Sequence, residues 1–203
     1  SLKQIYPGRE IDSVKVGGIR EKNVPNIIGA TTKSKTDMAI TWSDNSQTKL
    51  SIKKSLGGQA YLIRTSRFIE GYEAHYGTTI DEVVKDGLLL FFGEHPAIGS
   101  ILSQYPSENT GEQAYQIRKS RLTWHTLTKH DIRVANAMLD WIKENIGNIA
   151  DFCFSRGLAT SSNDWADYIW YKNMLGEHAI DQLFSIESMK EACTLRTDLV
   201  TMG

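Results

Sequence analysis

The stretch that most constrains the fold is residues 36–55, which read TDMAITWSDNSQTKLSIKKS. Apolar and polar residues alternate from Met38 to Trp42, with β-branched and aromatic side chains, and this pattern is typical of a half-buried strand. Residues 43–47 are turn formers whose short side chains hydrogen-bond to their own backbone. The alternation resumes at residues 50–53. The sequence therefore predicts a β-hairpin with Asp37 at the start of its first strand.

The hairpin would place an acid and an amine on one side of a small sheet. Ser51 and Lys53 are two residues apart and so point to the same face of the second strand. The Asp37 carboxylate is a hard oxygen ligand suited to Mg²⁺, which also takes phosphate oxygens. Lys53 could, as an ammonium, polarise an attacking water and offset charge on a phosphate, or, as a neutral amine, deprotonate that water. The alternative is a surface hairpin in which Asp37 caps a turn and Lys53 is solvated.

The same stretch resembles the PD-(D/E)XK nucleases, and within them the small type II restriction endonucleases of the MspI and HinP1I group. The run NIIGATTKSKTDMAI looks like the Gly-rich approach and S/P-K-T-D strand start of that group, and KLSIKKS looks like its N/Q-x-K-x-S strand. The middle position, an acid in most of the superfamily and Asn or Gln in this group, is Ser51. Further along, AMLDWIKENIGNIADFCFSRG and DWADYIW look like the helix pair and following strand of the HinP1I-like enzymes.

The resemblance implies an α/β, restriction-endonuclease-like fold with a central mixed β-sheet flanked by helices. It implies one endonuclease domain over residues 1–203. Residues 26–64 would form the catalytic hairpin and the DNA-contact loop after it, and residues 113–195 a mainly helical flanking part. The implied activity is Mg²⁺-dependent hydrolysis of double-stranded DNA at a short specific site, leaving 5′-phosphates.

Each site residue has an expected role. The catalytic residues would be Asp37, Ser51 and Lys53. Asp37 and the carbonyl of Ile52 would bind Mg²⁺, Ser51 would hold a metal-bound water, and Lys53 would position or activate the attacking water. Segments near the hairpin would contact DNA, through Lys33, Lys35, Lys54, Ser55, Gly58, Gln59, Tyr61 and Arg64.

The charge distribution is compatible with a DNA-binding surface, although the formal net charge is only −1. Residues 33–67 hold seven Lys and Arg against two Asp, and residues 118–133 hold five against one. A basic stripe of this kind is expected where a protein contacts backbone phosphates. The alternative is a solvated, Lys-rich face.

Other sequence features indicate the cellular compartment of the protein. The sequence has no apolar run long enough to span a bilayer and no signal peptide, so we expect a cytoplasmic protein. Its two cysteines, Cys153 and Cys193, have no metal-ligand spacing.

The expected partners are double-stranded DNA and, in the host, a cognate DNA methyltransferase; the chain would act as a monomer or homodimer. It begins with Ser and lacks the Gly/Lys/Gln-rich β segment expected after residue 195. Either sequence is missing at the termini, or part of the target-reading surface is lost or replaced.

Hydrophobic periodicity predicts the remaining elements. It predicts a helix over about 65–75, another over 80–92 opened by a Thr79–Glu82 capping box, and a loop over 94–112. It also predicts a long helix capped by Thr128, a strand over 168–172, and a strand followed by a helix over 180–195. Two other functions stay open: a DNA-binding module with a decayed nuclease site, and an interaction domain that touches no nucleic acid.

Overall fold

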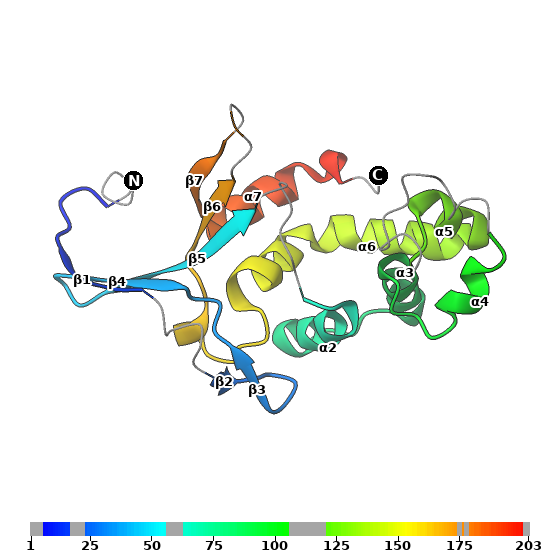
Figure 1. The fold of residues 1–203 in the computed structure, drawn as a ribbon, viewed down its shortest axis with the longest axis horizontal. Helices are drawn as coiled ribbons and strands as arrows, with labels where there is room; N and C mark the ends of the chain where they lie inside the picture. Colours follow the sequence, from blue (N-terminus) through cyan, green and yellow to red (C-terminus); the bar gives the residue numbers. More distant parts are fainter. Residues whose placement is uncertain are drawn as a thin grey trace. The chain divides into compact units, whose positions relative to one another are not determined.

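The chain divides into two compact units. Unit 1 combines Ser1–Ile63 with Gly147–Leu195, and unit 2 combines Arg64–Ile146 with Arg196–Gly203. The structure, a computed structural model (Figure 1), describes residues 6–16, 23–55, 63–105, 121–173, 176 and 179–200, without the side chains of residues 55 and 199. Predictions that fall on other residues, including Gly58, Gln59 and Tyr61, lie outside this description.

Unit 1 is built on a mixed β-sheet in which β5 is the central strand. In the described residues five strands follow the order β1-β4-β5-β6-β7, and β2 pairs with β3 separately. The pairings β1–β4, β4–β5 and β6–β7 are antiparallel, whereas β5–β6 is parallel. The strands are β1 (Ile11–Val16), β2 (Asn23–Pro25), β3 (Thr31–Lys33), β4 (Met38–Trp42), β5 (Gln47–Ser55), β6 (Tyr168–Asn173) and β7 (Asp181–Ser185).

The predicted hairpin is confirmed as β4 and β5. The turn between them is stabilised by Asp44, whose Oδ1 accepts hydrogen bonds from the backbone N–H of Ser46 at 2.9 Å and from its hydroxyl at 2.5 Å. Asn45 adopts a left-handed φ of 64°, which Asn tolerates better than most residues. Short polar side chains therefore close the turn as the sequence indicated.

One face of the sheet carries the core of unit 1. Ile40 and Trp42 of β4, Leu50 of β5 and Tyr168 of β6 form a buried cluster. Within it the indole Nε1 of Trp42 donates to the Thr48 hydroxyl at 2.8 Å, so a buried donor has its partner. Alternation along β4 and β5 thus directs one set of side chains into the core and leaves Ser51 and Lys53 on the other face.

Helices flank this sheet in unit 1. The end of α6 (Ile132–Asp151) continues into a π-helical turn, η3 (Phe152–Arg156), and a short 3₁₀ turn, η4 (Ser162–Asp164), precedes β6. The helix α7 (Ile186–Leu195) follows β7 directly, and the backbone N–H of its first residue donates to the carbonyl of Asp167 at 3.0 Å. The prediction of an α/β fold with a central mixed sheet flanked by helices is confirmed.

Unit 2 is helical in its described residues. Its elements are α2 (Thr65–Tyr76), α3 (Glu82–Phe92), α4 (Ile98–Leu102), α5 (Trp124–His130), the first part of α6, and η6 (Thr197–Leu199). Phe68, Tyr72 and Trp141 pack as a tilted and edge-to-face aromatic group. Gly87 of α3 lies so close to α6 that an added Cβ would be 2.9 Å from the Cβ of Met138.

Both predicted helix caps are wrong. The helix α3 begins at Glu82 after Asp81, which makes no side-chain capping bond, and Thr79 lies before it. Thr128 lies inside α5, where its hydroxyl donates to the carbonyl of His125. The cap of α5 is Thr123, and Asp131 accepts bonds from the first N–H groups of α6. A cap needs a specific backbone geometry, which the residue type alone does not specify.

The predicted loop over residues 94–112 contains the short helix α4, while residues 106–112 lie outside the description. None of the helices in the described part of the chain combines the length and hydropathy needed to cross a bilayer.

Candidate functional site

The Asp37 carboxylate lies beside β5, just past the end of the β4–β5 ladder. The last register pair is Met38 opposite Leu50, and the backbone N–H of Asp37 still donates to the Leu50 carbonyl at 2.8 Å. The Asp37 side chain then turns towards the partner strand, where its Oδ2 accepts the backbone N–H of Ile52 at 2.7 Å. The carboxylate is half-buried and is held by a short hydrogen bond to a rigid central strand.

Ser51 completes this contact. Its hydroxyl is 3.4 Å from the same Asp37 Oδ2, and the residue is 0 % exposed. Lys53, two residues further along β5, is half-buried and follows Ser51 on the same face of the strand. The parallel register places Ser51 opposite Ile169 and Lys53 opposite Tyr171 of β6. The structure thus brings Asp37 and Ser51 into contact. Lys53 lies on the same strand, β5, which is paired with a neighbouring strand on each side.

The carbonyl of Ile52 lies on the Asp37 side of β5. In an extended strand the N–H and C=O of one residue point to the same edge, and the N–H of Ile52 is bonded to Asp37. A carboxylate, a backbone carbonyl and a hydroxyl thus line one edge of the strand. All three are hard oxygen donors, as Mg²⁺ prefers.

The donor set fits a cation that shares its coordination with a substrate. Among the described residues, no group of three or more His, Cys, Asp or Glu side chains is placed to hold a metal ion. Mg²⁺ commonly uses one or two carboxylates, keeps several waters and takes the remaining oxygens from phosphate. The single Asp37 carboxylate is compatible with that mode and not with a closed structural metal site.

The segment before Asp37 contains two residues that sequence reasoning missed. Ser34 and Thr36 are both buried, and their hydroxyls donate to the carbonyls of Asp164 and Trp165 at 3.0 and 3.2 Å. Both lie in the S-K-T-D run, so the motif itself held a signal. Their partners lie about 130 residues later in the chain, which no local pattern reveals.

The predicted DNA-contact residues are placed only in part. Lys33 at the end of β3 and Lys54 near the end of β5 are exposed, and Lys33 donates to the Asn23 side chain at 2.7 Å. Lys35 is half-buried and its Nζ donates to the carbonyl of Cys153 at 3.2 Å. Arg64 is exposed but belongs to unit 2. The side chain of Ser55 lies outside the description, as do Gly58, Gln59 and Tyr61.

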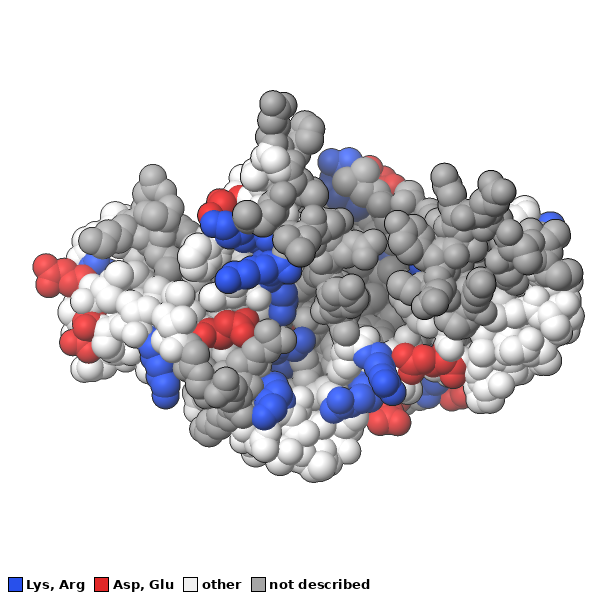
Figure 2. All heavy atoms as spheres, in the orientation of Figure 1, with Lys and Arg blue, Asp and Glu red and all other residues white. Residues whose placement is uncertain are grey.

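Basic side chains gather on part of unit 1. In Figure 2, Lys and Arg side chains form a broken column that begins over the region where Figure 1 shows β5 and β6 and continues towards β3, with some acidic side chains beside it. The part of the predicted stripe at residues 118–133 belongs to unit 2, and its first three residues lie outside the description. The local basic surface around β5 is therefore the part that bears on the Asp37 site.

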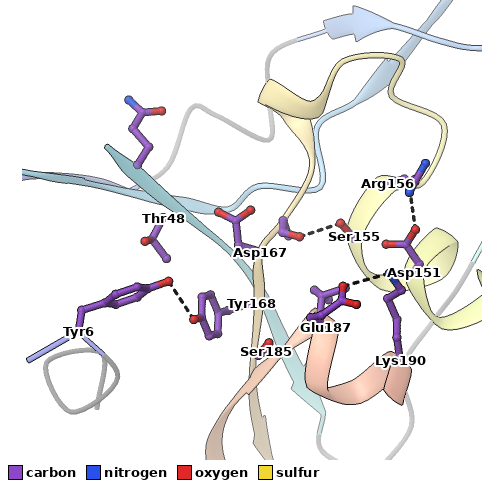
Figure 3. A pocket seen from close by; sticks show the side chains of 13 residues that line it. Tyr6, Thr48, Asp151, Ser155, Arg156, Asp167, Tyr168, Ser185, Glu187 and Lys190 are labelled. Atoms are coloured by element: carbon purple, nitrogen blue, oxygen red, sulfur yellow. Dashed lines mark hydrogen bonds and ion pairs between the residues drawn. The ribbon is translucent and has the colours of Figure 1, made fainter. Parts of the chain in front are cut away.

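Unit 1 also contains a polar pocket of about 470 Å³ that does not include Asp37, Ser51 or Lys53 in its lining. Six of its side chains bind one another in three pairs (Figure 3). They pair as Tyr6 with Tyr168 (2.9 Å), Asp151 with Arg156 (2.6 Å) and Glu187 with Lys190 (3.0 Å). This mutual pairing is what a structural polar network requires.

No family model matches the sequence, and no curated protein matches it. Among solved structures, the chain is similar to the crystal structure of the restriction endonuclease MspI in complex with its cognate DNA, with a TM-score of 0.43 and 11% sequence identity. The similarity covers 87% of this chain and 55% of that chain, so this chain spans little more than half of its length. A likeness at this level carries no argument about activity, and what the chain does has to be inferred from its own site.

Proposed function

We propose that this protein is a Mg²⁺-dependent type II restriction endonuclease. It would hydrolyse phosphodiester bonds of double-stranded DNA at a short specific site and leave 5′-phosphates. The observation that carries the proposal is the Asp37 carboxylate, bonded to the N–H of Ile52 at 2.7 Å beside the strand that bears Ser51 and Lys53. The basic surface around β5 supports DNA as the substrate, because neutralised phosphates supply most of non-specific DNA affinity.

Each group in this site has a role in the proposed reaction. Asp37 and the carbonyl of Ile52 would hold the cation. The sequence-based role of Ser51, to hold a metal-bound water, does not fit its full burial; its hydroxyl, 3.4 Å from the Asp37 Oδ2, would instead orient that carboxylate. The bound Mg²⁺ would act as a Lewis acid towards the phosphate. Lys53 would orient the attacking water, accept or share its proton, and offset negative charge as it develops on the phosphate oxygens. A host that carries such an enzyme would need a DNA methyltransferase to protect its own sites.

Paired substitutions test these roles. We expect Asp37→Asn to lower the rate of Mg²⁺-dependent cleavage by about 1,000-fold, since a metal contact worth several kcal/mol changes a rate tenfold per 1.4 kcal/mol. Lys53→Met should cost about 100-fold or more, the usual range for a lost proton-transfer group. Fragment yield on unmethylated DNA measures both.

Two control variants keep the change in charge but act elsewhere. Asp44→Asn alters the hairpin turn and its exposed ion pair with Arg9, and Lys190→Met removes a lysine that is paired with Glu187 at 3.0 Å on α7. Both controls should cleave like the wild type. Full cleavage by the Asp37 and Lys53 variants would contradict the proposal.

A second candidate is a DNA-binding module with a decayed site. The observation that favours it is Ser51, a fully buried hydroxyl at the position where a second acid would strengthen metal binding. This candidate predicts DNA binding that weakens with salt and no cleavage at any Mg²⁺ concentration.

A further inference from the structure

The segment that leads into the candidate site is anchored by buried hydroxyls, and we propose that Thr36, together with Ser34, positions the Asp37 carboxylate for cation binding. The inference rests on the proposed function, because it assigns a task within the same site. Thr36 would be a positioning residue that touches neither the cation nor DNA. Its side chain would act through the backbone of the residue next to it.

The anchor consists of three hydrogen bonds to two neighbouring carbonyls. The Thr36 hydroxyl donates to the Trp165 carbonyl at 3.2 Å, and the Ser34 hydroxyl donates to the Asp164 carbonyl at 3.0 Å. The backbone N–H of Lys35 donates to the same Asp164 carbonyl at 3.1 Å. The Ser34 oxygen also accepts the N–H of Thr36 at 3.1 Å, which uses both its donor and an acceptor position.

Burial makes these bonds necessary. Thr36 is 1 % exposed and Ser34 is 2 % exposed, so neither hydroxyl can exchange its carbonyl for water. A buried polar group left without a partner costs about 1–3 kcal/mol. The backbone of residues 34–36 is therefore held against residues 164–165 by contacts that are unfavourable to break.

The receiving carbonyls belong to a segment that is itself fixed on β5. Three residues after Trp165 the chain begins β6, which runs parallel to β5. Between them, the Asp167 backbone N–H donates to the Lys49 carbonyl at 2.8 Å, and Lys49 returns its own N–H to the Asp167 carboxylate at 2.8 Å. Residues 164–167 are therefore hydrogen-bonded both to the segment before Asp37 and to β5, the strand that carries Ser51.

Further contacts support Trp165. Its indole Nε1 donates to the Ala159 carbonyl at 2.7 Å, and the Arg156 guanidinium lies 4.5 Å from its ring centroid. Arg156 is in turn held by Asp151 through the 2.6 Å ion pair. The π-helical turn η3 therefore supports the carbonyl that Thr36 uses, and π-turns are often found at functional sites.

The anchor matters for cation binding because Asp37 supplies the only carboxylate among the described residues of the candidate site. Its Oδ2 is already directed by the N–H of Ile52, and the position of its backbone decides whether the group can reach a cation beside the Ile52 carbonyl. Loss of an outer contact that orients a ligand typically lowers metal affinity about 10–100-fold. Removal of the Thr36 hydroxyl should therefore weaken cation binding while the fold is kept.

The experiment titrates Mn²⁺, as the probe for a divalent cation, into the DNA-free protein and counts free ion by electron paramagnetic resonance. Thr36→Val removes the hydroxyl at nearly constant shape, and Thr36→Ser restores it. Thr48→Val is the matched control, because Thr48 is also a buried threonine of unit 1 whose hydroxyl is hydrogen-bonded. Asp37→Asn gives the level of Mn²⁺ binding that remains when the site is removed. Thermal unfolding of each variant shows whether it is still folded.

We expect Thr36→Val to raise the Kd for Mn²⁺ about 10-fold, whereas Thr36→Ser and Thr48→Val bind as the wild type does. Wild-type affinity in Thr36→Val, with binding lost in Asp37→Asn, would overturn the positioning role alone. An equal loss in Thr48→Val would also overturn it, because general destabilisation would then explain both. No difference between the wild type and Asp37→Asn would overturn the proposed function, and this inference with it.

Discussion

At the scale of single residues, the sequence predicted the members of the candidate site but not the hydroxyls that anchor the segment before it. Asp37, Ser51 and Lys53 follow from motif spacing, and the structure places the first two within 3.4 Å. Ser34 and Thr36 could not be assigned a role from sequence, since the carbonyls they bind are brought close only by the tertiary fold. Their roles depend on a long-range contact, whereas the spacing of the motif is local.

The tyrosine pair in the polar pocket gives a prediction about pH. Burial, followed by the hydrogen bond to Tyr6, raises the pKa of Tyr168 from 10.0 to about 12. A raised pKa means that the folded state favours the neutral phenol. Its contribution to stability is complete below pH 10 and is lost as the pH rises through about 12.

Absorbance titration of ionising tyrosines measures this effect. In Tyr6→Phe the pKa of Tyr168 should fall but stay above its usual value, because burial is the larger cause. Tyr105→Phe, which changes a tyrosine in unit 2, should leave the Tyr168 step in place. An unchanged pKa of Tyr168 in Tyr6→Phe would show that the hydroxyl pair does not exist in solution.

At the scale of elements, periodicity located strands and helices well and caps poorly. The hairpin, α2, β6, β7 and α7 lie where the patterns placed them, because alternation and helical spacing are local properties. The parallel pairing of β5 with β6 joins residues more than 100 positions apart, and no local pattern specifies it. The misplaced cap at Thr128 arose because α5 and α6 are separate helices divided at Asp131.

This correction makes a prediction about stability. Thr123→Ala should lower the free energy of unfolding by about 1 kcal/mol, since its hydroxyl oxygen accepts the N–H of Thr126 at the start of α5. Thr128→Ala should have a smaller effect, because its hydroxyl only bonds a carbonyl one turn earlier within the helix. Urea unfolding compares the two variants, and a larger loss in Thr128→Ala would contradict the assigned cap.

At the scale of the whole molecule, the sequence predicted the α/β class and its mixed sheet, and the described residues confirm both. Net charge was uninformative, because a formal charge of −1 conceals a basic surface around β5. The distribution of charge, and not its sum, bears on whether the protein binds DNA.

The same surface predicts how DNA affinity depends on salt. Lys54→Ala should weaken binding to DNA of any sequence. It should also reduce the slope of the logarithm of the DNA-binding constant against the logarithm of salt concentration by about 1, as expected for one lost phosphate contact. Lys190→Ala is the control, since that lysine is paired with Glu187 at 3.0 Å on α7. Equal slopes for the wild type and Lys54→Ala, measured by fluorescence anisotropy, would exclude a phosphate contact at Lys54.

The central claim is that the Asp37 site cleaves DNA, and one measurement tests it most directly. The wild-type protein is incubated with unmethylated phage DNA in Mg²⁺ or in EDTA, and the products are separated on a gel. The account predicts discrete fragments with 5′-phosphates in Mg²⁺ and intact DNA in EDTA. Intact DNA in both, at a protein excess that shifts the DNA at low salt, would contradict the nuclease and leave a DNA-binding module.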